Sequence, residues 1–122
     1  MSKALQTTFL VHAIVALILG VPLLILPGTF LKTIGWVAAD PMISRLLGAA
    51  LLALAWGSFR GWRATERTQV RILLELEAVF TVLGSIGLLR HLVIAPNMLI
   101  VWVIFLLLAV FAVAWVVFLF KK

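Results

Sequence analysis

Apolar residues gather in four long runs that are separated by short polar or proline-containing segments. The runs cover residues 7–26, 42–62, 71–90 and 96–120. A helix needs about 20 mostly apolar residues to cross the hydrocarbon of a bilayer, and each run reaches about that length. The pattern therefore predicts an all-α fold, a bundle of four transmembrane helices that forms a single membrane domain over residues 1–122.

Prolines shape the first run and the segment that follows it. Pro22 lies within the run and removes one backbone donor, so we expect a kink in this helix. Pro27 then ends the helix. The loop over residues 28–41 contains Phe30 and Trp36, which favours a position along the membrane surface.

The composition agrees with lipid as the solvent. Of the 122 residues, 66% are hydrophobic and 11% are charged, with a mean hydropathy of +1.30; an ordinary soluble domain is about half apolar and about a quarter charged.

Cysteine is absent, which excludes disulfides and cysteine catalysis. The net charge of +6 comes from residues around the apolar runs, where basic side chains contact anionic lipid, so we expect no nucleic-acid partner. The first run has no small-residue cleavage pattern after it and is expected to remain in the mature protein.

The basic residues also predict the orientation. Four spans place both termini on one side, together with seven basic residues: Lys3, Arg60, Arg63, Arg67, Arg71, Lys121 and Lys122. The other side has three: Lys32, Arg45 and Arg90. By the positive-inside rule both termini are cytoplasmic, in what we expect to be a prokaryotic cytoplasmic membrane. Tryptophans are expected at both interfaces, with Trp62 at the inner one and Trp36 at the outer one.

Small residues predict the faces through which the helices pack. Small residues that are four positions apart allow helix backbones to approach closely in lipid. Such stripes are Ala16 and Gly20 in the first run and Ala49, Ala53 and Gly57 in the second, and Gly84 and Gly87 are expected to be packing glycines of the third. His12 is four residues before Ala16 and shares its face, so we expect His12 in the interior.

A polar group near the inner boundary contains the strongest candidate for a binding site. Its members are His12, Ser58, Arg60, Arg71, Glu75 and Glu77. A charged residue within a span costs roughly 2.5–3.5 kcal/mol on insertion scales and so suggests a function or a partner. Glu77 shares a face with polar or small residues, whereas Glu75 has Arg71 one turn away. Glu77 is therefore expected inside the bundle, either as a proton- or cation-binding carboxylate near His12 or as an interhelical tie to His12 or an arginine.

A second polar group lies at the outer boundary. Its members are Asp40, Arg45, Arg90, His91 and Asn97. Asp40 precedes Pro41 and is expected to cap the second helix, while the two arginines pair with it or with lipid phosphate. The alternative is that these residues form a small polar opening that binds an anionic lipid headgroup.

Metal, cofactor and nucleophile signals are weak. His12 and His91 belong to opposite membrane boundaries and cannot jointly bind one iron or small metal ion, so we expect no metal and no cofactor. The serines at 44, 58 and 85 have no histidine and acid pattern beside them in the sequence.

The first half of the chain is similar to a group of small membrane proteins. Pro27 ends the first run, and an Asp followed by Arg-x-x-Gly opens the second, at Asp40, Arg45 and Gly48. This arrangement resembles the small, uncharacterised four-span integral membrane proteins of bacteria and archaea. The resemblance implies a four-helix bundle and carries over no activity.

Together these features favour a non-enzymatic function. We expect a small polytopic membrane protein that is a structural or accessory subunit, or that binds a lipid or another apolar molecule. The alternative is a small oligomeric proton-coupled transporter centred on Glu77, and the third possibility is a membrane enzyme for a lipophilic substrate with His12 and Glu77 as acid and base. The expected partners are membrane lipids and either further copies of the chain or a larger membrane complex.

Overall fold

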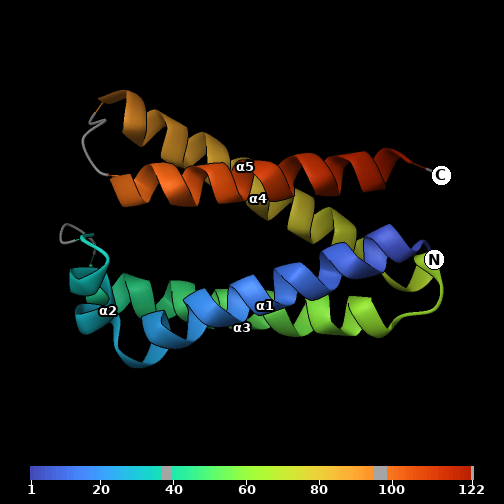
Figure 1. The fold of residues 1–122 in the computed structure, drawn as a ribbon, viewed down its shortest axis with the longest axis horizontal. Coiled ribbons are helices and arrows are strands. Elements are labelled where there is room, and N and C mark those ends of the chain that lie inside the picture. The colour runs from blue at the N-terminus through green and yellow to red at the C-terminus, as the bar shows by residue number, and fades with distance from the viewer. Residues whose placement is uncertain (37–39, 95–98, 122) are drawn as a thin grey trace. The chain divides into compact units, whose positions relative to one another are not determined.

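A long helix matches each of the four predicted spans (Figure 1). The computed structural model describes residues 1–36, 40–94 and 99–121. The long helices are α1 (Lys3–Ile25), α3 (Pro41–Arg63), α4 (Arg71–Ile94) and α5 (Leu99–Phe120), and the shorter elements are α2 (Pro27–Thr33) and the 3-10 turn η1 (Arg67–Gln69). All four long helices have the length and composition to cross a membrane. Over the described ranges there is no strand, so the all-α prediction is confirmed.

The starts of the helices follow capping rules. Ser2 accepts a hydrogen bond from the backbone N–H of Leu5 at 3.2 Å, and α1 therefore begins at Lys3, before the predicted span. Asp40 accepts from the backbone N–H of Met42 at 2.8 Å and caps α3 as expected. Helix α1 continues through Pro22. Residues 95–98, which include the predicted start of the fourth span, lie outside the described residues.

The segment after α1 was expected to be a loop, and it instead contains α2. The backbone breaks at Leu26, and Pro27 lies in the first turn of the new helix, where its missing N–H costs nothing. Gly35 ends the segment with a φ of +82°, which glycine adopts without strain. The backbone N–H groups of Gly35 and Trp36 donate to the carbonyls of Lys32 and Leu31, which is a Schellman motif.

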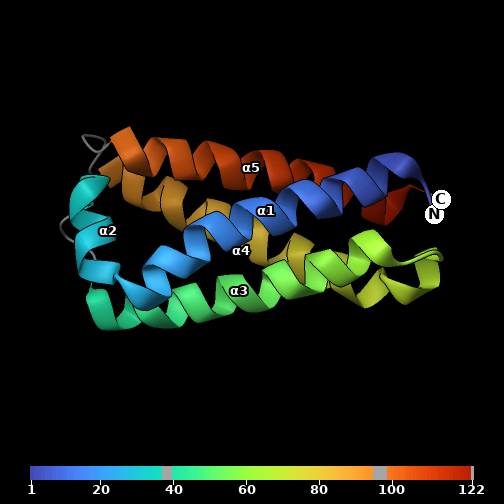
Figure 2. The ribbon, with the colours of Figure 1, turned by 60° about the horizontal axis from the view of Figure 1, so that its bottom comes forward.

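The chain divides into two compact units, Met1–Arg67 and Thr68–Lys122. In the first unit α1 and α3 run antiparallel and lie side by side in both ribbon views (Figures 1 and 2). Their backbones approach closely at Gly48. A Cβ atom there would lie 2.6 Å from the Leu24 nitrogen and 2.9 Å from the Gly20 carbonyl oxygen. A side chain at position 48 would therefore force the two helices apart.

The packing faces were predicted correctly for α1 and wrongly for α3. Ala16 and Gly20 are buried, as expected. On α3 Ala49 and Ala53 are exposed, and the buried residues are Ser44, Gly48, Ala55, Ser58 and Gly61. Both faces of α3 carry small residues, so spacing alone did not separate them. The face with Gly48 allows direct backbone contact, and its Ser58 bonds to His12 of α1, which favours this face for packing.

The second unit consists of α4 and α5, which pack against each other. A Cβ atom on Gly84 would lie 3.3 Å from the Leu108 Cδ1 atom, so Gly84 is a packing glycine as expected. No atom lies within 4 Å of a Cβ on Gly87, and the same prediction is wrong there. On α5 the rings of Phe111 and Trp115 stack at 6.3 Å. The prediction that both units form one domain stays a prediction.

Candidate functional site

An apolar groove lies between α1 and α3 in the first unit. Its volume is about 360 Å³. The lining side chains are all apolar: Leu10, Ala13, Ile14 and Leu17 from α1 and Leu52, Ala55, Trp56 and Phe59 from α3. Ala13 and Ala55 are buried and form the floor, whereas Trp56 is 63% exposed and forms part of a wall. Two alanines between larger neighbours on antiparallel helices thus leave a depression that an apolar chain can fill.

The sequence pattern alone does not predict this groove. Ala13 and Ala55 belong to neither predicted small-residue stripe. The signal that was available is the contrast in size along each helix, since Ala13 lies between Leu10 and Leu17 on one face. It becomes meaningful only once the register of α1 against α3 is known.

A buried polar pair connects α1 and α3. The His12 Nδ1 atom lies 2.8 Å from the Ser58 Oγ atom, and both residues are buried. His12 is thus in the interior, as predicted. Ser58 has no histidine beside it in the sequence, yet the fold brings it to His12 from 46 residues away. Because Ser58 is 0% exposed, this pair acts in the structure as an interhelical hydrogen bond.

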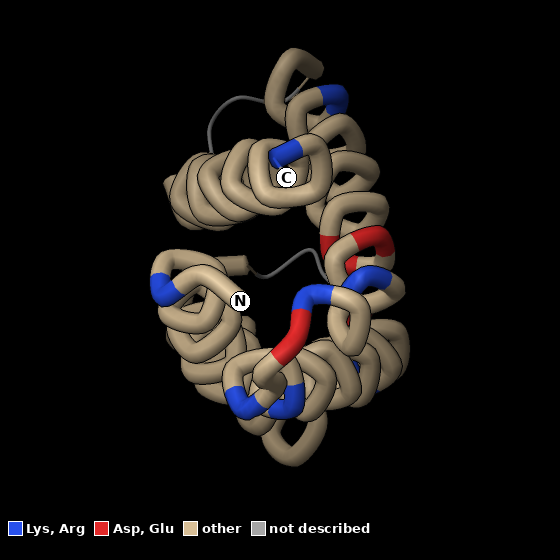
Figure 3. Tube along the Cα trace, turned by 90° about the vertical axis from the view of Figure 1, so that its right-hand side faces the viewer, with Lys and Arg blue, Asp and Glu red and all other residues tan. Residues whose placement is uncertain are grey.

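The end of the first unit where the chain begins is tied together by polar contacts and carries a cluster of cations. Gln6 Nε2 donates to the Ala64 carbonyl at 3.1 Å, and the Met1 amino group donates to the Thr65 carbonyl at 3.3 Å. Figure 3 faces this end, with the Lys and Arg positions in blue. Lys3, Arg60 and Arg63 are exposed there.

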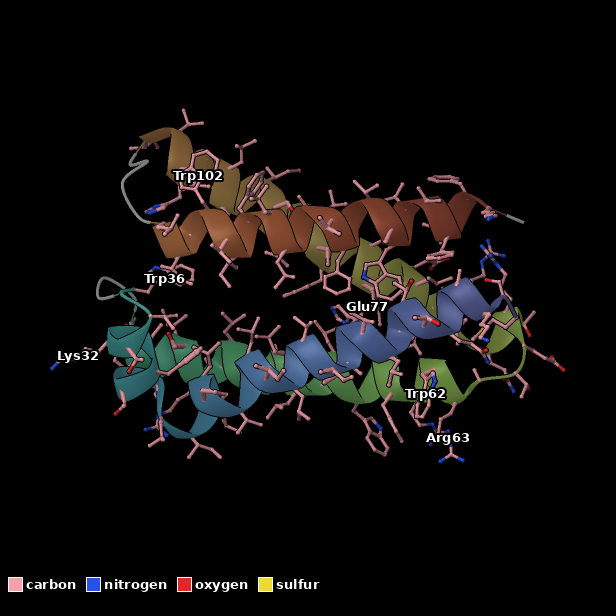
Figure 4. All side chains as sticks on the ribbon, in the orientation of Figure 1. Lys32, Trp36, Trp62, Arg63, Glu77 and Trp102 are labelled. Carbon is pink, nitrogen blue, oxygen red and sulfur yellow. The ribbon has the colours of Figure 1, made fainter. Side chains whose placement is uncertain are left out.

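Basic and aromatic residues mark both ends of this unit. Figure 4 shows Trp62 and Arg63 near the C-terminal end of α3, and Lys32 and Trp36 at the opposite end of the hairpin. Interfacial tryptophans and cations at the two ends of a pair of helices are typical of a membrane-spanning hairpin. The distance between these groups follows from α3 itself, since its 23 residues extend about 35 Å.

The two glutamates of α4 have different environments. Glu77 is 1% exposed. The Glu75 side chain is 52% exposed and accepts from Arg71 Nε at 3.5 Å, as the sequence predicts for a pair one turn apart. Thr81, on the Glu77 face, donates to the Glu77 carbonyl at 2.7 Å, which satisfies its hydroxyl within the helix. The expected pairing of Glu77 with His12 joins the two units and stays a prediction.

The outer polar residues do not all take the expected partners. Asp40 caps α3, and Arg45 Nη1 donates to the Leu24 carbonyl at 3.2 Å, near the C-terminal end of α1. Arg45 thereby satisfies a carbonyl in a last helical turn, which helix geometry leaves without a backbone donor. Arg90 and His91 are exposed near the end of α4. Asn97 lies outside the described residues. Among the residues that the structure describes, no three His, Asp or Glu side chains are grouped as metal ligands.

Comparison with known proteins gives no family assignment. No family model matches the chain, and neither a curated protein nor a solved structure shows significant similarity to it. The function must therefore be argued from the residues themselves.

Proposed function

We propose that the chain is a four-span integral membrane protein that binds an apolar molecule, the acyl chain of a membrane lipid, in the groove between α1 and α3. The observation that carries the proposal is a depression of about 360 Å³ with an entirely apolar lining and a floor of two alanines. Both termini face the cytoplasm, as the distribution of basic residues favours. The protein performs no chemistry of its own and acts as a lipid-binding accessory component of the cytoplasmic membrane.

The polar groups near the groove support a binding function without catalysis. His12 and Ser58 bond to each other and are not among the residues that line the groove, whose side chains are all apolar. An acyl chain needs only apolar contact and a fitting shape, which two helices with a recessed pair of alanines provide. A reacting substrate would in addition need a polar group that it can reach.

Native mass spectrometry of the full chain in mild detergent tests the proposal. Purified protein should retain one lipid molecule. Ala55→Leu fills the floor and should remove it, while Ala53→Leu adds the same side chain at an exposed position of the same helix and should leave it in place. Retention of the lipid by Ala55→Leu, or its absence from the unmodified chain, would contradict the proposal.

One observation favours a second candidate function, a proton-coupled transporter. Glu77 is buried in the first half of α4, in a helix of the length and composition to span the membrane. A carboxylate in such a position suggests proton or cation binding. When a proton gradient is imposed on liposomes that contain the protein, protons should then cross the membrane and change the internal pH. Glu77→Gln should abolish this proton flux, while Glu75→Gln should leave it unchanged.

A further inference from the structure

On each of the two helices, the residues that line the groove are followed by a basic residue towards one end of the hairpin. On α3 Leu52, Trp56 and Phe59 line the groove, and Arg63 follows Phe59 at the spacing of one turn. On α1 Lys3 precedes Leu10 by seven residues and so shares its face. Both cations are exposed. Each wall of the groove therefore leads to one positive charge.

The two charges lie at the same end because the helices are antiparallel and tied together there. The hydrogen bond from Gln6, three residues after Lys3, to the carbonyl of Ala64, the residue after Arg63, connects the two helices at this end. Residues 1–8 and 60–67 together carry the amino terminus, Lys3 and three arginines against one carboxylate, Glu66. This end of the groove is thus strongly positive.

The dimensions match a phospholipid. The lining extends from residue 10 to 17 and from residue 52 to 59, eight residues of each helix or about 10 Å, and Arg63 and Lys3 lie about 6 and 10 Å beyond it along their helices. One leaflet has about 15 Å of hydrocarbon. A chain in the groove therefore places its headgroup at the level of the two cations, which the long side chain of Arg63 can adjust. Figure 4 shows Arg63 extending away from the helix body.

We propose that the groove selects an anionic phospholipid, with one acyl chain between α1 and α3 and the phosphate bound by Lys3 and Arg63. This inference rests on the proposed function and adds the class of lipid to it. Zwitterionic lipids with the same acyl chains fit the apolar part equally well and differ in the headgroup, which carries no net charge. The preference for an anionic headgroup therefore comes from the cations and is worth about fivefold for each of them.

Quenching of Trp56 by brominated lipids measures the lipid beside it. The full chain is placed in phosphatidylcholine liposomes that contain, in separate samples, phosphatidylglycerol or phosphatidylcholine with brominated acyl chains. The Trp56 signal is the difference between the unmodified chain and Trp56→Phe, which removes the contribution of the other tryptophans. We expect brominated phosphatidylglycerol to quench Trp56 at a mole fraction at least fivefold lower than brominated phosphatidylcholine does.

Two arginine variants of α3 separate a binding site from general surface charge. Arg63→Gln should lower the preference about fivefold. Arg60→Gln removes the same charge from the same end, but position 60 is rotated about 100° from Phe59 and should leave the preference unchanged. Ala55→Leu should reduce the preference towards one, and Ala53→Leu should not. The arginine variants are at exposed positions, and their helical circular dichroism should equal that of the unmodified chain.

Each of the remaining outcomes overturns part of the argument. Equal quenching by both brominated lipids, or an equal effect of Arg60→Gln and Arg63→Gln, would contradict the anionic preference. If native mass spectrometry still shows a lipid that Ala55→Leu removes, the proposed function stands and only the lipid class is wrong. No quenching of Trp56 by either lipid would mean that a protein segment covers the groove, and both proposals would then fail.

Discussion

Replacing Gly48 by alanine tests the contact on which the first unit depends. The added Cβ atom would lie 2.6 Å from the Leu24 nitrogen, whereas ordinary contact begins at 3.4 Å. The obstructing atoms belong to the backbone of α1, so no side-chain rotation relieves the overlap, and the helices must separate by about 0.8 Å. Such overpacking costs about 1–3 kcal/mol. The better helix propensity of alanine stabilises the folded protein by at most about 1 kcal/mol, which offsets part of this cost.

The expected result is a net loss of up to about 2 kcal/mol in the free energy of unfolding, and a deficit of about 1–3 kcal/mol relative to a glycine-to-alanine change without overlap. The measurement is reversible unfolding of the full chain by titration with sodium dodecyl sulfate in mixed micelles, followed by circular dichroism. Gly20→Ala should lose less, because its Cβ would lie 3.0 Å from the Leu52 side chain, which can move, and 3.1 Å from the Gly48 carbonyl oxygen, which is a smaller backbone overlap than the one at position 48.

The matched control is Gly87→Ala in α4. No atom lies within 4 Å of a Cβ at that position, so the substitution should be neutral or stabilise the protein by up to about 1 kcal/mol. The predicted order of stability is Gly87→Ala, then Gly20→Ala, then Gly48→Ala. If Gly48→Ala is as stable as Gly87→Ala, the two helices do not approach closely at this point and the packing described for the first unit is wrong.

Three further predictions concern polar groups. Asp40→Ala should lower the free energy of unfolding by about 1 kcal/mol through loss of the α3 cap, with Asp40→Asn retaining most of it. In a double-mutant cycle His12→Ala and Ser58→Ala should show a coupling of about 0.6 kcal/mol or more, as for hydrogen bonds between membrane helices, and additive effects would contradict their contact. Glu77→Gln should alter folding or proton flux much more than Glu75→Gln, and its effect should be non-additive with His12→Ala; equal tolerance of both glutamine variants would contradict an internal role for Glu77.

The features that sequence predicted well are those set within one helix. The four long helices follow from apolar runs of the length that a bilayer requires. The difference between Glu75 and Glu77 follows from two residues of helical rotation, about 200°, which places one beside Arg71 and the other on a face of small residues. The Asp40 cap follows from the residue type before a proline-started helix.

The features that sequence missed depend on which faces of two helices meet. Both faces of α3 carry small residues, and the choice between Ala53 and Gly48 depends on the fit against Gly20. The contact of His12 with Ser58 follows from that same register, and so does the groove over Ala13 and Ala55. Helix α2 was missed because Pro27 was interpreted as the end of one helix, although proline also starts helices.

The packing of the first unit also determines which part of the groove can distinguish one lipid from another. The buried His12 side chain lies 2.8 Å from Ser58, and the exposed Arg45 donates to the Leu24 carbonyl; neither His12, Ser58 nor Arg45 lines the groove. The groove lining is apolar and treats all acyl chains alike. Discrimination between lipids therefore has to come from the end of the groove, where Lys3 and Arg63 are exposed. A headgroup preference that is lost with Arg63 and retained with Arg60 is the consequence that this arrangement requires.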